Sequence, residues 1–152
     1  MTYFLANESD TLALGKQLAM LCPPDQLFVI HLEGELGAGK TTLTRGFLRA
    51  LGHQGHVKSP TYTLVEHYQL QQRPIYHFDL YRLSDPEELD FLGMDDYFSG
   101  NAICLIEWPQ QGAGFLPPAD LSIRLDYKDN ARSAQIEPHT TAAKQLHHKL
   151  QI

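Results

Sequence analysis

Apolar residues along the chain recur in spacings that predict an alternation of buried strands and amphipathic helices. Residues 27–32 form a short, nearly continuous apolar run between turn residues, which is typical of a parallel strand buried on both faces. Residues 102–109 contain a second run of this kind. Helical spacing of leucines marks residues 10–21, and a further helix is predicted after the first buried strand, over residues 42–51. This order indicates an α/β protein.

Alternating apolar and polar residues predict further strands around this framework. One hairpin is expected from the second half of residues 57–70 together with residues 74–81, and another from residues 120–128 and 132–137. Thr2–Leu5 is expected to form a short edge strand. The pattern therefore favours a three-layer α/β fold with a central, mostly parallel sheet and inserted antiparallel hairpins.

Length and composition indicate the number of domains and the cellular compartment. The chain has 152 residues, of which 43% are hydrophobic and 20% charged, and residues 1–152 are predicted to form a single domain. Neither a basic leader nor an apolar stretch of membrane-spanning length is visible, so we expect a cytoplasmic protein without membrane contact. The net charge of -6 argues against a general polyanion-binding surface, and if RNA is involved a partner is expected to hold most of it.

The turn after residues 27–32 carries the first motif with a defined chemistry. Gly34, Gly39, Lys40 and Thr41 satisfy the spacing G-x-x-x-x-G-K-[ST], between a predicted strand and a predicted helix. Glycines let backbone N–H groups wrap a polyphosphate, and the helix N-terminus adds the positive end of its dipole. In such a loop the lysine binds β- and γ-phosphate oxygens, and the threonine hydroxyl binds Mg²⁺. The motif therefore predicts a P-loop NTPase-like fold that binds a nucleotide.

Two acidic residues follow strands on which a P-loop protein places its metal-binding groups. Asp79 lies near the end of strand 74–81, on the same face as His77, and Glu107 lies near the end of strand 102–109. The carboxyl ends of parallel strands border the ligand crevice of an α/β sheet. Both acids are therefore candidates for holding Mg²⁺ or its waters.

Each of these acids also has a structural interpretation. Asp79 could instead form a salt bridge with Arg73 or Arg82, and Glu107 could cap a neighbouring helix. P-loop enzymes more often use aspartate than glutamate at the second position, so Glu107 departs mildly from the usual pattern. The adjacent Trp108 could pack over the nucleotide, contact a partner or fill a gap in the core.

The segment that follows the P-loop unit has two interpretations as well. The hydroxyls of Ser59, Thr61 and Thr63 suit a segment that senses the γ-phosphate, which P-loop proteins often place here. The alternative is an ordinary surface loop with a turn at Pro60. The residue types alone favour neither interpretation.

An acidic segment, residues 84–98, is predicted to be a short helical element. Ser84 and Glu87 have the spacing of a capping box, and Pro86 suits a first helical turn. Part of its apolar residues are expected to pack inward. Its acidic side is either a solvated face or a docking surface.

Four stretches now stand out: G-E-L-G-A-G-K-T-T at 34–42, V-K-S-P-T-Y-T-L-V at 57–65, Y-H-F-D-L-Y-R-L at 76–83 and L-I-E-W-P at 105–109. Together they resemble the TsaE (formerly YjeE) family, the small bacterial ATPases of tRNA threonylcarbamoyladenosine biosynthesis. The resemblance spans roughly residues 27–118 and is far more specific than the P-loop motif alone. It implies an ATP hydrolase that serves a TsaB–TsaD assembly, which transfers threonylcarbamoyl to the adenosine next to the anticodon of tRNA.

The resemblance also implies roles for individual residues. Lys40, Asp79 and Glu107 are expected to be catalytic, Thr41 and Glu107 to bind Mg²⁺, and residues 59–63 to form a switch region. The implied cofactors are ATP, with ADP as product, and Mg²⁺. The residues expected to contact the nucleotide, the last two by flanking the adenine, are Gly37, Ala38, Gly39, Lys40, Thr41, Thr42, Thr11 and Arg132.

Slow hydrolysis is expected from the chain alone, with faster turnover when partners are present. No arginine finger is evident in cis, because Arg45 and Arg49 lie on the P-loop helix and point away on a helical count. A small P-loop metabolite kinase is one alternative, although an acceptor pocket and an arginine-bearing lid leave little room in 152 residues with 12 Lys plus Arg. A non-catalytic, ATP-dependent binding protein is the other.

Overall fold

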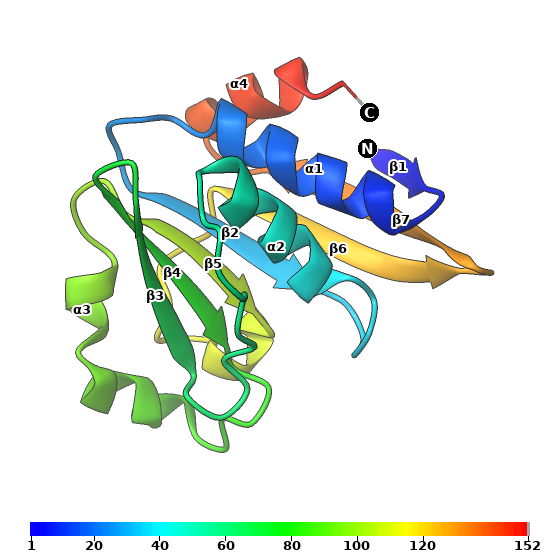
Figure 1. Cartoon of the computed structure of the whole chain (residues 1–152). Coiled ribbons are helices and arrows are strands. Elements are labelled where there is room, and N and C mark those ends of the chain that lie inside the picture. Colours follow the sequence, from blue (N-terminus) through cyan, green and yellow to red (C-terminus); the bar gives the residue numbers. More distant parts are fainter. Residues whose placement is uncertain (152) are drawn as a thin grey trace.

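One continuous sheet contains all of the predicted strands (Figure 1). The computed structural model describes residues 1–151, and Ile152, the last residue of the predicted domain, lies outside the described residues. Within residues 1–151, seven strands pair in the order β1-β7-β6-β2-β5-β4-β3. Their bounds are β1 Thr2–Leu5, β2 Phe28–Glu33, β3 Val65–Leu70, β4 Arg73–Asp79, β5 Ile103–Glu107, β6 Leu121–Lys128 and β7 Ala131–Pro138.

The sheet combines a parallel centre with antiparallel edges. β2 runs parallel to both β5 and β6, and β4 runs parallel to β5. β3 pairs antiparallel with β4, and β7 pairs antiparallel with both β6 and β1. The predicted hairpins are therefore β3–β4 and β6–β7, and each contributes one strand to the parallel centre. The predicted α/β fold class is confirmed.

Three helices cover one face of the sheet. They are α1 (Glu8–Leu21), α2 (Lys40–Ala50) and α4 (Thr141–Lys149), and they lie side by side above the strands (Figure 1). A cluster of buried apolar side chains fills the space beneath them and includes Leu18 of α1 and Phe47 of α2. Among residues 1–151, no helix has the length and apolarity that crossing a membrane requires.

The opposite face is covered by shorter elements. The 3₁₀ helix η1 (Pro86–Leu92), the single-turn helix α3 (Met94–Tyr97) and the 3₁₀ helix η2 (Pro109–Gly112) follow the chain over this face. Their apolar residues join a second buried cluster, in which Leu89 of η1 packs with Phe78 of β4. This third layer lies over β2, β4 and β5, and the ends of β4 and β5 carry the predicted acidic residues.

Helices α1 and α2 approach each other closely at two glycines. A Cβ atom on Gly15 would overlap the carbonyl oxygen of Leu43, and one on Gly46 would overlap that of Leu12. Any larger side chain would push the two helices apart. This contact fixes α2, the helix that begins at the predicted phosphate-binding loop, against the rest of the fold.

Two helices begin earlier than predicted. α1 starts at Glu8, because the side chain of Asn7 caps it by accepting a hydrogen bond from the N–H of Asp10 (3.0 Å). α2 starts at Lys40, directly after Gly39, whose φ of 113° ends the preceding loop. Lys40, the lysine predicted to bind phosphate, is therefore the first residue of the helix.

The cap of the acidic segment was predicted at the wrong residue. The capping box begins at Asp85, whose side chain accepts a hydrogen bond from the N–H of Glu87 (3.0 Å), and Glu88 closes it. The prediction had paired Ser84 with Glu87. Because Pro86 occupies the first position of η1, the residue immediately before it becomes the cap.

Candidate functional site

The loop between β2 and α2 has the backbone of a phosphate cradle. Gly34 and Gly39 have φ angles of 140° and 113°, which side chains other than glycine rarely adopt. Gly34 also lies so close to the carbonyl oxygen of Leu125 on β6 that a Cβ atom would overlap it. The loop therefore curls at the N-terminus of α2, where backbone N–H groups and the helix dipole favour an anion.

Two adjoining hollows border this loop and share Gly37, Gly39 and Thr42. One has a volume of about 200 Å³ and lies beside the ends of β4 and β5; its lining residues are Leu36, Gly37, Gly39, Lys40, Thr41, Thr42, Ser59, Thr61, Asp79, Glu107 and Trp108. The other has a volume of about 160 Å³ and lies beside α1 and the β6–β7 turn; its lining residues are Glu8, Thr11, Gly37, Gly39, Thr42, Asn130 and Arg132. We call the first, beside β4 and β5, the phosphate-side hollow and the second, beside α1 and the β6–β7 turn, the base-side hollow. Together they are lined by every residue that was expected to be catalytic, to bind Mg²⁺ or to contact the nucleotide, except Ala38.

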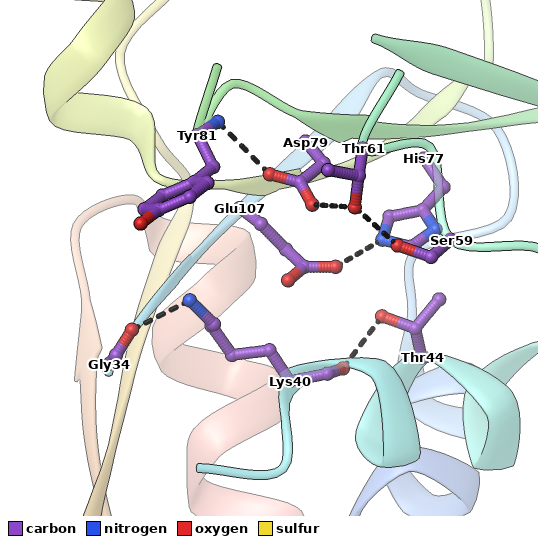
Figure 2. A network of polar contacts seen from close by, with 9 residues as sticks. All are labelled: Gly34, Lys40, Thr44, Ser59, Thr61, His77, Asp79, Tyr81 and Glu107. Atoms are coloured by element: carbon purple, nitrogen blue, oxygen red, sulfur yellow. Dashed lines mark hydrogen bonds and ion pairs between the residues drawn. The ribbon is translucent and has the colours of Figure 1, made fainter. Parts of the chain in front are cut away.

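Lys40 lies across the phosphate-side hollow. Its Nζ donates a hydrogen bond to the carbonyl oxygen of Gly34 (2.6 Å; Figure 2). The same Nζ lies 4.0 Å from the centre of the Trp108 ring. Burial lowers the pKa of the Lys40 ammonium from its ordinary value, and the charges of Glu107 and Asp79 partly oppose this shift. The lysine is thus a buried cation held by a carbonyl and a ring, both of which a phosphate could replace.

Asp79 and Glu107 lie side by side at the ends of β4 and β5, in register with each other. Both are buried. Asp79 accepts hydrogen bonds from the backbone N–H of Tyr81 (3.0 Å) and from the hydroxyl of Thr61 (3.3 Å) (Figure 2). Glu107 accepts one from the ring of His77 (2.6 Å), and not from a helix N-terminus. The interpretation of Glu107 as a helix cap is therefore wrong.

The alternative salt bridges of Asp79 are also absent from the described residues. Arg73 donates hydrogen bonds to the backbone carbonyls of Asn101 and of Gln26 (2.7 Å to the latter). Arg82 lies 4.5 Å from the centre of the Tyr62 ring. Both arginines are engaged elsewhere, and neither pairs with Asp79.

The segment before β3 reaches the same acids. The hydroxyls of Ser59 and Thr61 lie 2.7 Å apart, and Thr61 continues this chain of hydrogen bonds to Asp79. Thr63 turns away and donates instead to Glu66 (3.3 Å). Leu64, which ends the segment, has a φ of 69°, an uncommon conformation for a branched side chain. Of the three predicted hydroxyls, two line the hollow and one does not.

The base-side hollow contains two residues that sequence reasoning missed, besides the predicted Thr11 and Arg132. Asn130 and Glu8 line it, and Glu8 also pairs with Arg45 of α2. Nothing in the sequence indicates that Asn130, in the β6–β7 turn, lines the same hollow as Gly37 and Gly39 of the glycine-rich loop.

Tyr127 on β6 links this turn to the loop. Its hydroxyl donates a hydrogen bond to the carbonyl oxygen of Leu36 (2.8 Å). Arg132 lies 4.2 Å from the centre of the Tyr127 ring and donates to the carbonyl oxygen of Gly37 (3.4 Å). Ala38 is buried, and its N–H donates a hydrogen bond to the backbone carbonyl oxygen of Glu35 (3.1 Å). Its predicted contact with a nucleotide therefore stays a prediction.

The donor set suits Mg²⁺ held together with a nucleotide. No three His, Cys, Asp or Glu side chains among residues 1–151 gather so that they could hold a metal by themselves. Mg²⁺ keeps several waters and takes one or two carboxylates together with substrate phosphates. A hydroxyl at Thr41 and the carboxylates of Glu107 and Asp79 around one hollow fit that requirement.

Asp79 is expected to lower the stability of the nucleotide-free protein at neutral pH. Burial raises the pKa of Asp79 above its ordinary value of 3.8; the Tyr81 hydrogen bond opposes the shift and the Glu107 charge adds to it. An acid whose pKa is raised on folding contributes stability below its unfolded pKa, and this contribution is lost as the pH rises through the folded value. We therefore expect Asp79→Asn to unfold at a higher temperature than the wild type at pH 7, with a difference that shrinks on acidification.

Thermal unfolding followed by circular dichroism from pH 7 down to pH 5 measures this difference. The amide oxygen still accepts the hydrogen bond from Tyr81, so the local structure is preserved. Asp95→Asn, at an exposed position on α3, is the matched control and should change the free energy of unfolding by less than about 0.5 kcal/mol. A wild type at least as stable as Asp79→Asn at pH 7 would show that the carboxylate is not destabilised by its burial.

A central strand that leads through a glycine-rich loop into a helix, with carboxylates at the ends of the adjacent strands, defines the P-loop class of nucleotide-binding folds. Comparison with known proteins narrows the class. The family model described as "Threonylcarbamoyl adenosine biosynthesis protein TsaE" matches residues 5–135, and the chain belongs to the TsaE family. This family acts in the biosynthesis of threonylcarbamoyladenosine in tRNA.

Individual relatives agree with this assignment. The tRNA threonylcarbamoyladenosine biosynthesis protein TsaE of Haemophilus influenzae is 49% identical over 149 residues, which cover 96% of this chain and 94% of that protein. The protein of the same name from Bacillus subtilis is 43% identical over 117 residues, covering 77% of this chain and 72% of that protein. The crystal structure of Bacillus subtilis YdiB superposes with a TM-score of 0.82 at 31% identity, covering 98% of this chain and 92% of that one. The resemblance inferred from the four sequence stretches is confirmed.

Proposed function

We propose that the protein is a Mg²⁺-dependent ATPase that assists the TsaB–TsaD pair in forming threonylcarbamoyladenosine next to the anticodon of tRNA, in the cytoplasm. The observation that supports it most is the convergence of Lys40, Thr41, Asp79 and Glu107 on one hollow at the N-terminus of α2. A lysine, a hydroxyl and two carboxylates around a phosphate-sized space are the groups that phosphoryl transfer from ATP requires. The tRNA is reached indirectly, through the partners.

The protein's own groups divide the work of hydrolysis. The loop N–H groups and Lys40 bind the β- and γ-phosphates, and for this Lys40 leaves the carbonyl oxygen of Gly34. Thr41 and Glu107 would hold Mg²⁺, and the ion would supply positive charge to the phosphate oxygens. Asp79 lies beside Glu107 and would accept hydrogen bonds from the waters of the ion. Thr11 and Arg132 flank the adenine in the base-side hollow.

The segment of Ser59 and Thr61 couples this chemistry to a partner. Thr61 donates a hydrogen bond to Asp79, so a γ-phosphate that draws on the same groups would change the position of the segment. The segment is exposed at Ser59, where a second protein has access to it. A conformational change of this kind lets the partner distinguish the ATP-bound from the ADP-bound protein.

Dependence on a partner follows from the charges around the phosphate-side hollow. Its lining, within residues 1–151, includes Lys40 but no arginine. Arg45 is paired with Glu8, and Arg82 is stacked on Tyr62. An arginine finger supplied in trans accelerates other P-loop hydrolases by about 10³–10⁵-fold. The chain alone is therefore expected to turn over slowly.

Phosphate release from ATP and Mg²⁺ by the chain alone tests this function against its alternatives. We expect inorganic phosphate as the product, at a rate well below about 10 per second, the typical enzyme value. A phosphorylated metabolite in place of free phosphate would identify a small P-loop kinase. Tight ATP binding with no phosphate release under any condition, partners included, would identify a non-catalytic, ATP-dependent binding protein.

A further inference from the structure

His77 is a buried histidine for which the proposed chemistry has no direct use. It lies on β4, two residues before Asp79, and is 0% exposed. Its ring Nε2 lies 2.6 Å from Oε2 of Glu107 on the neighbouring strand, and the Glu107 side chain is 5% exposed. A hydrogen bond this short between two buried side chains on rigid strands is a defined feature of the fold.

The remaining atoms of the pair indicate which way this hydrogen bond runs. Nδ1 of His77 has no hydrogen-bond partner among the residues that the structure describes. A carboxylate only accepts hydrogen bonds, so Nε2 carries a hydrogen and donates a hydrogen bond to Glu107. The ring thus occupies one of the two oxygens of Glu107 and leaves the other for the phosphate-side hollow (Figure 2).

Without this donor, Glu107 would have another attraction. Lys40 faces the same hollow, and the charge of Glu107 is the main factor that raises the pKa of Lys40 against the effect of burial. A carboxylate free to rotate would move toward this cation, since the attraction between buried charges is strong. Such an ion pair would occupy both groups that the phosphates and Mg²⁺ need.

We propose that His77 is a positioning residue: it holds the Glu107 carboxylate in the orientation that binds Mg²⁺ and keeps it apart from Lys40. The inference rests on the proposed function, because it assigns a task to His77 at the same metal site. Residues that hydrogen-bond to metal ligands in this way commonly contribute about 10- to 100-fold to metal affinity. His77 contributes to catalysis through Glu107 and does not touch the nucleotide.

Two substitutions separate the hydrogen bond from the volume of the ring. His77→Leu fills the buried space without a donor, and His77→Gln places an amide N–H near the position of Nε2. The quantity measured is the Mg²⁺ concentration that gives half of the maximal increase in ADP affinity. ADP binding is monitored by calorimetry or by the fluorescence of Trp108, the single tryptophan of the chain. This readout needs no turnover.

We expect His77→Leu to raise that Mg²⁺ concentration by about tenfold or more and to leave ADP affinity without Mg²⁺ unchanged. His77→Gln is expected to restore most of the Mg²⁺ response. His31→Leu is the matched control, because His31 is a half-buried histidine of β2 whose Nε2 also lacks a partner among the described residues. Since β-strand side chains alternate between faces, His31 lies on the sheet face away from Lys40. His31→Leu should therefore leave the Mg²⁺ dependence of ADP binding unchanged.

Several outcomes would overturn the inference. A wild-type Mg²⁺ response in His77→Leu would do so and would leave the proposed function intact. If His77→Leu fails to fold, His77→Asn replaces it, since the shorter amide cannot reach Glu107 and is expected to show the same loss; a wild-type response there is equally contradictory. A wild-type protein whose nucleotide affinity ignores Mg²⁺ would instead contradict the proposed function itself.

Discussion

Replacing Lys40 with alanine is expected to lower the affinity for ATP and ADP by about two orders of magnitude. The ammonium would make at least two charge-assisted hydrogen bonds to phosphate oxygens, of about 1.5 kcal/mol each, and each 1.4 kcal/mol is about tenfold in affinity. Removing the amine also removes a charge that burial disfavours, since burial lowers the pKa of Lys40. Calorimetric titration with ADP measures the loss.

Lys16→Ala is the matched control for this experiment. Lys16 is exposed on α1, beside a hollow at the other end of the sheet lined by Cys22 and Leu70, and its removal changes the net charge by the same amount. ADP affinity should stay at the wild-type value in this control. Unchanged affinity in Lys40→Ala would contradict the ATPase and both alternatives, the kinase and the binding protein, because all three require the phosphate contact.

Replacing Glu107 with glutamine is expected to reduce ATP hydrolysis by about 10²–10³-fold, the usual cost of losing one preorganised electrostatic group. The amide has the shape of the carboxylate and its oxygen still accepts the hydrogen bond from His77, so the fold should be retained. What is lost is the negative charge that lines the phosphate-side hollow and that we propose to bind Mg²⁺. Phosphate release measured at saturating ATP and Mg²⁺ gives the effect on turnover.

Two further measurements test whether the effect of Glu107→Gln is specific to hydrolysis: its ADP affinity, and the rate of ATP hydrolysis by a control variant. ADP affinity without Mg²⁺ should be unchanged in Glu107→Gln, because the loop and Lys40 remain. Glu137→Gln, at an exposed position on β7, should hydrolyse ATP at the wild-type rate. A Glu107→Gln variant with normal phosphate release but altered partner binding would favour the non-catalytic binding protein.

Hydrophobic spacing alone predicted most of the fold. Residues 27–32 and 102–109 were recognised as buried strands because a parallel strand covered on both faces is apolar throughout, and they correspond to β2 and β5. The predicted hairpins correspond to β3–β4 and β6–β7. The spacing of apolar residues does not predict the order of the strands in the sheet, because that order depends on contacts between distant parts of the chain. For example, β6 pairs directly with β2, although the two strands lie far apart in the sequence.

The core of the candidate site was predictable because its chemistry lies in contiguous motifs. Lys40 and Thr41 belong to one loop, and Asp79 and Glu107 end strands that meet in register. His77 had a visible signal, since alternation places it on the same face as Asp79, but only the structure reveals its hydrogen bond to Glu107.

The base-side hollow was harder to predict from the sequence than the phosphate-side hollow. Tyr127 contacts the phosphate-binding loop through its hydroxyl, and Asn130 lines the base-side hollow. Both come from the β6–β7 hairpin, whose alternating pattern predicts strands but not the direction in which the turn folds. Thr11 and Arg132 were found there through resemblance to the family and not through spacing.

The rate of phosphate release from ATP and Mg²⁺, measured with the chain alone and with TsaB–TsaD and substrate tRNA, tests the central claim most directly. We predict slow turnover by the chain alone and at least about a tenfold increase with the partners, since a group supplied in trans can complete the charge around the γ-phosphate. The Glu107→Gln variant should stay slow in both conditions. A rate near about 10 per second without partners, or a rate that partners leave unchanged, would contradict the account.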